Sequence, residues 1–285
     1  MPIDTHTRLC AVIGNPVEHS LSPAIHNAAF RAAGLNYVYT AFRVEDVGAC
    51  LAGMRAMRGF RGLSITIPHK MTVMAHLDKI DLLAERVGSV NTIVNEDGEL
   101  TGYTTDGPGT LRAFEEAGVS LDGRRVLFIG SGGAVRAVAF AVAELTRAQS
   151  ITLIGRTPAR VAAIVDDLAP RAAIPVEAAD LTGQLEAAVA DSDILIQGTP
   201  IGMHPNPGET PVPAELLESR HVCFDMVYRP GKTRFIQDAE ARGCTTILGI
   251  EMLLNQAALQ FEHWTGLTAP LEAMRAAALE ALGET

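Results

Sequence analysis

The chain has 285 residues, of which 48% are hydrophobic and 20% are charged. This balance predicts a globular protein, with two domains of ordinary size at this length, and argues against a disordered chain. The formal net charge of −10 argues against a large nucleic-acid-binding surface. The apolar stretches are too short, or too often interrupted by glycine and charged residues, to cross a membrane.

The cysteines are widely scattered and form no CxxC pair; they are Cys10, Cys50, Cys223 and Cys244. This spacing argues against a disulfide framework or a structural zinc site, and predicts reduced, mostly buried thiols. The first residues lack the basic and then apolar pattern of a signal peptide. We therefore expect a cytoplasmic protein without a bound metal.

Short apolar runs alternate with amphipathic helical runs, which predicts an α/β fold with mainly parallel sheets. In the first part of the chain, a helix is expected to begin at Ser22-Pro23, with Ser22 as its cap, and to end near Gly34. Asp97-Gly98 predicts a tight turn between two strands. The strands expected in this part are 9–13, 37–44, 62–67, 87–94 and 100–104.

A second unit is expected to begin after Asp106. Its predicted strands are 126–129, 151–154, 194–197, 222–226 and 245–248, and a helix is predicted over 134–145. Residues 251–282 are helical in pattern and are expected to cross back to the first unit. We therefore predict one domain at 1–106, completed by helices within 250–285, and a second domain at 107–249.

A glycine-rich turn joins the strand at 126–129 to the following helix. It reads Gly130-Ser131-Gly132-Gly133-Ala134. Glycine at 130 permits a tight turn, and glycine at 132 lets the backbone approach a pyrophosphate at the helix N-terminus. The third glycine of the usual fingerprint is absent, because position 135 is Val. The alternative is a strand–helix turn that binds no ligand.

The residues after the next strand bear on the choice of cofactor. NAD-binding sites usually carry an acidic residue here, whereas this chain has Arg156 and Arg160 and no carboxylate before Asp166. Guanidinium groups pair well with a phosphate, so the sequence favours NADP over NAD. The alternative is that Arg156 only stacks on the adenine and that Arg160 is a solvated helix residue.

Small polar residues are frequent just after the strands of the first unit. Ligands of open α/β sheets bind beyond the carboxyl ends of the strands, and hydroxyl and amide groups there suit a small polyhydroxylated molecule. Each residue alone is explained equally well as a helix cap or a turn. Together with Lys70, the residues of this group are Ser20, Ser22, Thr66, Asn91, Thr92 and Thr104.

Eight ordered motifs resemble those of the shikimate/quinate dehydrogenase family. The resemblance extends from about Leu9 to the C-terminal helices. It implies an NAD(P)-dependent alcohol dehydrogenase that interconverts 3-dehydroshikimate and shikimate, or dehydroquinate and quinate, without a metal. The motifs are residues 14–27, 64–70, 88–92, 104–107, 130–134, 156–157, 225–228 and 249–256.

The resemblance implies that the domain at 1–106, with helices from 250–285, is the substrate-binding catalytic domain and that 107–249 is a Rossmann-type dinucleotide-binding domain. It also implies a role for individual residues. Lys70 and Asp106 would flank the hydroxyl group that is oxidised and carry the proton transfer. The substrate, a small cyclic carboxylate with several hydroxyl groups, would be bound by Ser20, Ser22, Thr66, Asn91, Tyr228 and Gln256. The cofactor would be bound by Gly130, Ser131, Gly132, Gly133, Ala134, Arg156, Thr157, Arg160, Thr199, Met203 and Gly249.

Four positions depart from the family pattern: Ser64, Thr104, Gly155 and Gln197. The leading interpretation is a dehydrogenase of aromatic amino acid biosynthesis that reduces 3-dehydroshikimate with NADPH. The alternatives are an NAD-preferring quinate/shikimate or aminoshikimate-type enzyme and, from another functional class, a ligand-sensing module without turnover. Monomer and homodimer are both compatible with the sequence.

Overall fold

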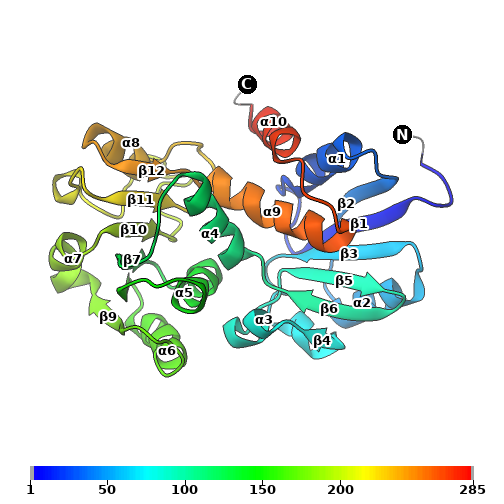
Figure 1. Cartoon of the computed structure of the whole chain (residues 1–285), viewed down its shortest axis with the longest axis horizontal. Coiled ribbons are helices and arrows are strands. Elements are labelled where there is room, and N and C mark those ends of the chain that lie inside the picture. Colours follow the sequence, from blue (N-terminus) through cyan, green and yellow to red (C-terminus); the bar gives the residue numbers. More distant parts are fainter. Residues whose placement is uncertain (1–2, 284–285) are drawn as a thin grey trace. The chain divides into compact units, whose positions relative to one another are not determined.

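The computed structural model describes residues 3–283, which divide into two compact units. One unit contains the residues up to Gly109 and those from Leu254 onward, and the other is Thr110–Leu253. The two chain crossings fall inside helices α4 (Asp106–Glu116) and α9 (Gly249–Thr265). Figure 1 shows both units as sheets covered by helices.

The first unit is built on a mixed sheet with the strand order β2-β1-β3-β5-β6-β4. The pairs β1–β2 and β1–β3 are parallel, as predicted, whereas β5 is antiparallel to both β3 and β6. The strands are β1 (Arg8–Gly14), β2 (Tyr37–Arg43), β3 (Phe60–Ile65), β4 (Lys79–Ile80), β5 (Thr92–Glu96) and β6 (Glu99–Tyr103).

The turn between β5 and β6 confirms one expectation, and the segment before it contradicts another. Asp97 and Gly98 both adopt positive φ angles, 52° and 98°, as a tight hairpin turn requires. The expected strand at 87–94 is wrong in its first half, because Val87 ends helix α3 (Leu82–Val87). The Asp81 side chain caps that helix, and left-handed Gly88 ends it.

Helices pack on both faces of this sheet. They are α1 (Ser22–Ala32), α2 (Val47–Ala56), α3, a 3₁₀ turn at Thr72–His76, α9 and α10 (Leu271–Leu282). The expected cap was wrong: Ser22 is the first helical residue of α1, the preceding residue is Leu21, and no side chain among residues 3–283 caps the helix. Helix α1 ends just before left-handed Gly34, as predicted.

The C-terminal helices pack against the first sheet and its helices. Helix α10 lies beside α1 (Figure 1). Trp264 of α9 is fully buried and donates from its indole nitrogen to the Ile93 carbonyl at 3.0 Å. Its ring lies where a side chain at Gly62 would be, 2.0 Å from an ideal Cβ there. Glycine at 62 is therefore required for α9 to approach the sheet.

The second unit contains a fully parallel sheet with the order β9-β8-β7-β10-β11-β12. Numbered along the chain, the strands have the order 3-2-1-4-5-6 of dinucleotide-binding folds. Successive strands are added toward one edge from β7 to β9 and toward the other edge from β10 to β12. The strands are β7 (Arg125–Ile129), β8 (Ser150–Gly155), β9 (Val176–Asp180), β10 (Ile194–Gln197), β11 (Val222–Asp225) and β12 (Thr245–Ile247). Strand β9 was not predicted, because this edge strand has the weakly apolar sequence VEAAD.

Side chains alternate across this sheet and meet helices on both faces. Val189 and Phe235 from α7 and α8 pack with Leu127 and Leu195 on one face. On the other face, Phe114 of α4 packs edge-on against Phe224 with ring centroids 5.6 Å apart. The helices are α5 (Gly133–Leu145), α6 (Pro158–Leu168), α7 (Leu181–Ala190), a 3₁₀ turn at Ala214–Leu216 and α8 (Arg234–Ala241).

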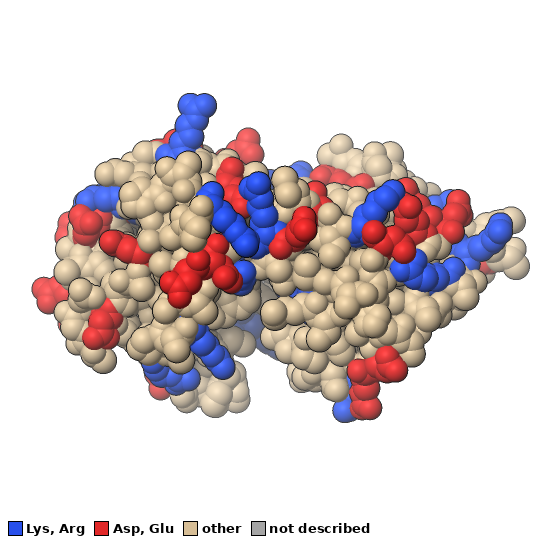
Figure 2. Space-filling model, turned by 90° about the horizontal axis from the view of Figure 1, so that it is seen from below, with Lys and Arg blue, Asp and Glu red and all other residues tan. Residues whose placement is uncertain are grey.

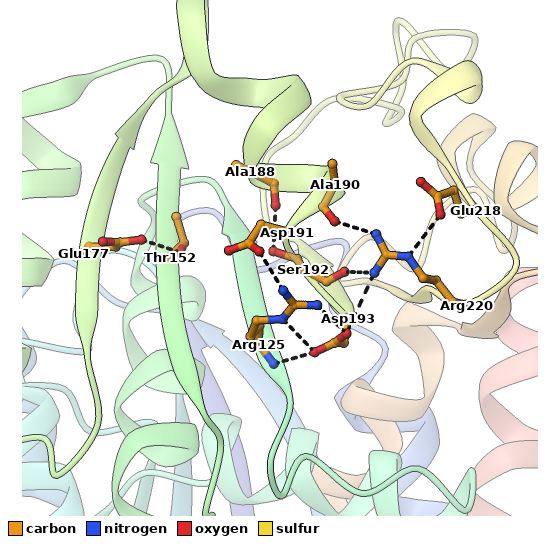
Figure 3. A network of polar contacts seen from close by, with 10 residues as sticks. All are labelled: Arg125, Thr152, Glu177, Ala188, Ala190, Asp191, Ser192, Asp193, Glu218 and Arg220. Atoms are coloured by element: carbon orange, nitrogen blue, oxygen red, sulfur yellow. Dashed lines mark hydrogen bonds and ion pairs between the residues drawn. The ribbon is translucent and has the colours of Figure 1, made fainter.

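An ionic network joins the amino ends of β7, β10 and β11 (Figure 3). The Asp193 carboxylate accepts from the Arg125 backbone nitrogen at 2.9 Å and from the Arg125 guanidinium at 3.0 and 3.2 Å. Arg220 lies 3.8 Å from the same carboxylate and donates to the Ser192 carbonyl at 2.7 Å. The hydrogen bonds from Arg125 hold the pKa of Asp193 below its ordinary value.

On the face shown in Figure 2, acidic and basic side chains are interspersed and form no continuous basic surface. Among the described residues, no helix has both the length and the apolar character needed to cross a membrane. The four cysteines are free thiols, of which Cys10 and Cys223 are buried.

Replacing Asp193 by Asn should lower the free energy of unfolding by roughly 1–3 kcal/mol at pH 7, because charged hydrogen bonds to Arg125 are lost. A carboxylate whose folded pKa is depressed stabilises the fold above its unfolded pKa, about 3.9, and loses that contribution as the pH falls through the folded pKa. Denaturant unfolding should therefore show a smaller difference in the free energy of unfolding between wild type and variant at pH 3 than at pH 7.

Asp191→Asn is the matched control, since Asp191 contacts the same arginine but its side chain is 80% exposed. Its loss of stability should be much smaller. An equal loss for the two variants would contradict the central place of Asp193 in the network.

Candidate functional site

Lys70 and Asp106, which the sequence predicts to carry the proton transfer, form an ion pair in the structure. The Lys70 ammonium lies 2.5 Å from the Asp106 carboxylate, as a directly hydrogen-bonded ion pair. The Lys70 side chain is 26% exposed and the Asp106 side chain 10% exposed. A cation that is held beside a carboxylate and still reaches the surface can exchange a proton with a bound ligand.

Local structure explains where Lys70 lies. It follows β3 in a turn, and its carbonyl accepts from the Val90 nitrogen at 2.9 Å. His69 is buried, and its Nε2 lies 2.7 Å from the Val44 carbonyl. Since a carbonyl only accepts, His69 donates there and anchors the turn.

Asn91 joins Asp106 to the sheet. It is 2% exposed and directly precedes β5. Its amide nitrogen donates to Asp106 Oδ1 at 2.8 Å and to Thr105 Oγ1 at 3.0 Å. Its amide oxygen accepts from the Thr105 nitrogen at 2.8 Å and from Thr92 Oγ1 at 2.8 Å. Both ends of the predicted substrate ligand Asn91 are therefore occupied by the protein itself.

Gln260 of α9 extends this network and was missed by the sequence analysis. It is 2% exposed. Its amide nitrogen donates to Thr92 Oγ1 at 3.1 Å and to the Asn91 carbonyl at 3.2 Å. Its amide oxygen accepts from Ser64 Oγ at 2.8 Å. The available signal was its spacing of four residues from Gln256, which places both amides on one helix face.

Two further buried side chains close the network at its far end. The Tyr39 hydroxyl donates to Ser64 Oγ at 2.6 Å. His26 stacks on the Tyr39 ring, with centroids 4.5 Å apart, and its Nε2 is 3.3 Å from the Gln260 amide oxygen. Burial lowers the pKa of His26 to about 3, so its ring is neutral at physiological pH and donates to Gln260.

Of the other predicted substrate ligands of the first unit, Ser20, Ser22 and Thr66 lie at strand and helix ends, whereas Gln256 lies within α9. Ser20 Oγ accepts from the Ser22 nitrogen at 3.3 Å, and Ser22 begins α1. Thr66 follows β3 and occupies the space where Gly14 would carry a side chain, 2.4 Å from an ideal Cβ. Gln256 lies against Gly109 of α4, whose ideal Cβ would be 2.5 Å from the Gln256 nitrogen.

The two first-unit departures from the family pattern are both buried. Ser64 is a link between Tyr39 and Gln260. The Thr104 hydroxyl is buried without a hydrogen-bond partner among residues 3–283. Ser64 therefore has a role inside the network that is separate from any direct ligand contact.

In the second unit, the glycine-rich turn lies where the strand order reverses. Gly130 follows β7 with φ 125°, a conformation that other residues rarely adopt. Its ideal Cβ would also be 2.9 Å from the Gly198 carbonyl oxygen after β10. Val135 fills the space left by the absent side chain of Gly198, 2.3 Å from an ideal Cβ. Glycine at 198 thus provides the close helix–strand packing for which the usual fingerprint has its third glycine.

The start of α5 fits a dinucleotide pyrophosphate. Gly132 precedes the helix, and no side chain in the described part of the chain caps its first backbone N–H groups. Ideal Cβ atoms on Gly132 and Gly133 would meet nothing within 4 Å, so the backbone is open to a ligand. Ser131 and Ala134, also predicted to bind the cofactor, are half-buried beside them.

The predicted phosphate-binding residues follow β8. Arg156 and Arg160 are exposed, and neither takes part in an ion pair within the described part of the chain. Thr157 is exposed and precedes the first residue of α6. Two guanidinium groups without a carboxylate partner beyond the second strand fit a 2′-phosphate.

The loop after β10 is held by Gln197, which the sequence analysis noted only as a departure from the family. Its buried amide accepts from the Thr199 nitrogen at 2.7 Å and donates to the Thr199 and Ile201 carbonyls at 3.0 Å. Met203, further along this loop, is 41% exposed. A glutamine that ends an apolar strand was the available signal for this loop anchor.

The loop after β11 carries Tyr228 and is held by Asp225. This buried carboxylate accepts from Thr233 Oγ1 at 2.5 Å and from the Val227 nitrogen at 2.9 Å. Burial raises the pKa of Asp225 to about 6, against the effect of these hydrogen bonds. Burial also raises the pKa of Tyr228. Gly249 packs against this loop, its ideal Cβ 2.4 Å from the Val227 carbonyl oxygen.

Family models match two segments of the chain. Residues 12–93 match the shikimate dehydrogenase substrate binding domain. Residues 249–279 match the shikimate 5′-dehydrogenase C-terminal domain. The first segment contains Lys70 and Asn91, and the second contains Gln256 and Gln260.

Similar proteins match the chain over nearly its whole length. The shikimate dehydrogenase (NADP(+)) of Moorella thermoacetica is 44% identical and covers 99% of this chain and 96% of its own. That of Thermococcus kodakarensis is 45% identical, with 99% of each chain covered. The crystal structure of shikimate 5-dehydrogenase from Listeria monocytogenes in complex with shikimate and NAD has a TM-score of 0.92 and 38% identity, and covers 97% of this chain and 98% of that one. On this evidence, the chain belongs to the shikimate dehydrogenase family.

Proposed function

We propose that this protein reversibly reduces 3-dehydroshikimate to shikimate with NADPH. The observation that carries the proposal is the partly exposed Lys70–Asp106 ion pair, 2.5 Å across, in a chain of the shikimate dehydrogenase family. A positioned lysine beside a carboxylate is the chemistry that alcohol–ketone interconversion needs at the oxygen atom.

In this proposal, Lys70 exchanges the proton with the substrate oxygen, and Asp106 keeps Lys70 in place. When bound, NADPH supplies the hydride to the ring carbonyl carbon. The carbonyl oxygen then takes a proton from Lys70 Nζ, so that ketone, hydride and proton together give the alcohol. In the oxidation, the neutral Lys70 amine takes the hydroxyl proton. Asp106 holds the ammonium group in place and stabilises its charge.

The remaining substrate contacts are proposed from the family roles and the placement of each residue. Ser20 and Ser22, at the start of α1, bind the carboxylate, and Thr66 and Gln256 bind ring hydroxyls. Tyr228, in the loop after β11, is a further substrate ligand in this proposal. The assignment of Ser22 and Thr66 is supported by their positions at the start of a helix and after a strand, where the ligands of such sheets bind.

The second unit binds the cofactor in this proposal. The pyrophosphate lies at the uncapped start of α5, Arg156 and Arg160 bind the 2′-phosphate, and Met203 lies against the nicotinamide. The unpaired arginines, together with the NADP(+) named for the 44–45% identical relatives, favour NADP over NAD. We further propose that the enzyme acts in the cytoplasm, since four free thiols are typical of a reducing compartment.

The first test is to assay shikimate and quinate with NADP⁺ and with NAD⁺. The highest kcat/KM is expected for shikimate with NADP⁺, measured by absorbance of the reduced cofactor. A higher value for quinate with NAD⁺ would replace the proposal with the quinate-type alternative. Tight calorimetric binding of shikimate without any cofactor reduction would indicate a sensing module instead.

Lys70→Met should lower kcat by about 10²–10⁴-fold, the usual contribution of a general acid–base, with KM for shikimate within a fewfold. Lys79→Met is the matched control, because Lys79 forms an exposed ion pair with Glu99 at 2.6 Å in the same unit. The control should keep the wild-type kcat. A Lys70→Met variant that binds shikimate poorly but retains kcat would show a binding role only.

Replacing Arg156 and Arg160 together by Gln should raise KM for NADP⁺ by about 10–100-fold, since charged hydrogen bonds to a phosphate contribute about 1.5–3 kcal/mol. KM for NAD⁺, which lacks that phosphate, should change little. Arg147→Gln is the control, because Arg147 is exposed and precedes β8, at its opposite end. Equal changes for both cofactors would refute 2′-phosphate recognition.

A further inference from the structure

The hydrogen bonds around Asn91 run in one direction toward the proton-transfer pair. We propose that Gln260 is a positioning residue for Asp106, acting through Thr92 and Asn91. The proposal rests on the proposed function only in taking Lys70 and Asp106 as the catalytic pair. Gln260 itself is on helix α9 and touches neither member of that pair through any hydrogen bond described above.

The direction of each hydrogen bond is set by groups that have only one role. The backbone carbonyl of Asn91 can only accept a hydrogen bond, so the Gln260 side-chain atom that faces it is the amide nitrogen. The Thr105 backbone nitrogen can only donate, so the end of the Asn91 amide that faces it is the oxygen. The nitrogen of Asn91 must therefore face Asp106, to which it donates at 2.8 Å.

The Thr92 hydroxyl connects these two amides. It accepts from the Gln260 nitrogen at 3.1 Å and donates its single proton to the Asn91 oxygen at 2.8 Å. Its other close neighbour is Thr105 Oγ1 at 3.4 Å, a longer contact. With Gln260 in place, the Thr92 proton points to Asn91. Without the Gln260 donor, the Thr92 hydroxyl can turn away from Asn91. The Asn91 side-chain oxygen then loses one of its two closest hydrogen-bond donors.

The hydrogen bonds on the other side of Gln260 orient its amide in the same direction. Tyr39 donates to Ser64 at 2.6 Å, which leaves the Ser64 proton for the Gln260 oxygen at 2.8 Å. Successive donors that point the same way strengthen one another in a buried site. The chain thus ends with Asn91 holding one oxygen of Asp106, which directs the other oxygen to Lys70.

This arrangement predicts an effect on turnover more than on binding. Because the Asn91 amide is saturated by Thr92, Thr105 and Asp106, its hydrogen bonds hold the carboxylate in position. A displaced Asp106 leaves Lys70 misplaced for proton transfer, and small misplacements of reacting groups reduce the rate strongly. Ser22, proposed to bind the substrate carboxylate, meets this network only at the Tyr39 hydroxyl, on the side of Gln260 away from Asp106 among the hydrogen bonds of the described residues.

The test compares Gln260→Met with Trp264→Phe in the full-length protein. Methionine matches the length of glutamine but neither donates nor accepts strongly, so kcat should fall about tenfold while KM for shikimate and NADP⁺ stays within about twofold. Trp264 lies one turn later on α9 and also bonds to the backbone of this region, to the Ile93 carbonyl. Trp264→Phe should lower the melting temperature but keep kcat within about twofold.

Thr92→Val carries the same test if Gln260→Met does not fold. It removes the connecting hydroxyl with little change in shape and should also lower kcat about tenfold. Because both residues act through one path, the Thr92→Val/Gln260→Met double variant should be no slower than about the slower single variant. That lack of additivity distinguishes positioning through Thr92 from two separate structural losses.

Each outcome bears on the inference. A normal kcat in a folded Gln260→Met or Thr92→Val protein, a change confined to KM, or multiplicative losses in the double variant would overturn it. The ratio to wild type is measured on whichever substrate the wild type turns over best. A wild type that prefers quinate would therefore refute the proposed function while the ratios still test the role of Gln260.

Discussion

A buried amide keeps its place only if each of its donors and acceptors has a partner, and Asn91 meets this condition with groups from three parts of the fold. Thr92 comes from the start of β5, Thr105 and Asp106 from the start of α4, and Gln260 approaches from α9 through Thr92. The hairpin, the helix that leaves the sheet and the returning C-terminal helix must therefore all be in place before Asp106 is held. Because the hydrogen-bonding groups of Asn91 need partners from all of these segments, the position of the Lys70–Asp106 pair depends on the fold of the whole unit.

The fold could be predicted well from the sequence because its elements are marked locally. Buried runs such as Ile194–Gln197 are apolar throughout, and Asp97-Gly98 marks the hairpin. Segments whose structure depends on their neighbours were harder: Val87 is apolar and β-branched, yet it ends a helix because Asp81 and Gly88 cap both ends. The ion pair itself was predictable from its motifs. The role of Gln260 was not, because a glutamine on a helix becomes informative only when the helix is known to lie over β5.

Several departures from the expected patterns are explained by packing. Val135 replaces the third glycine of the dinucleotide fingerprint because Gly198 makes the room instead. Gln197 ends an apolar strand because its amide holds the loop that follows. Ser64 is small enough for both Tyr39 and Gln260 to reach its hydroxyl. In each case the unusual residue is compensated by a second residue distant in sequence, so a single position read alone is misleading.

The Arg125–Asp193–Arg220 network lies at the amino ends of its strands, whereas the glycine turn, Arg156 and the Gln197 loop all follow carboxyl ends. The stabilising charges and the predicted ligand contacts of this sheet therefore share no residues. Effects at well-separated sites add nearly independently. This unit is consequently a favourable scaffold for evolving or engineering a different nucleotide preference. The loops predicted to bind the cofactor can be exchanged, while the ionic network at the amino ends continues to hold the strands in register.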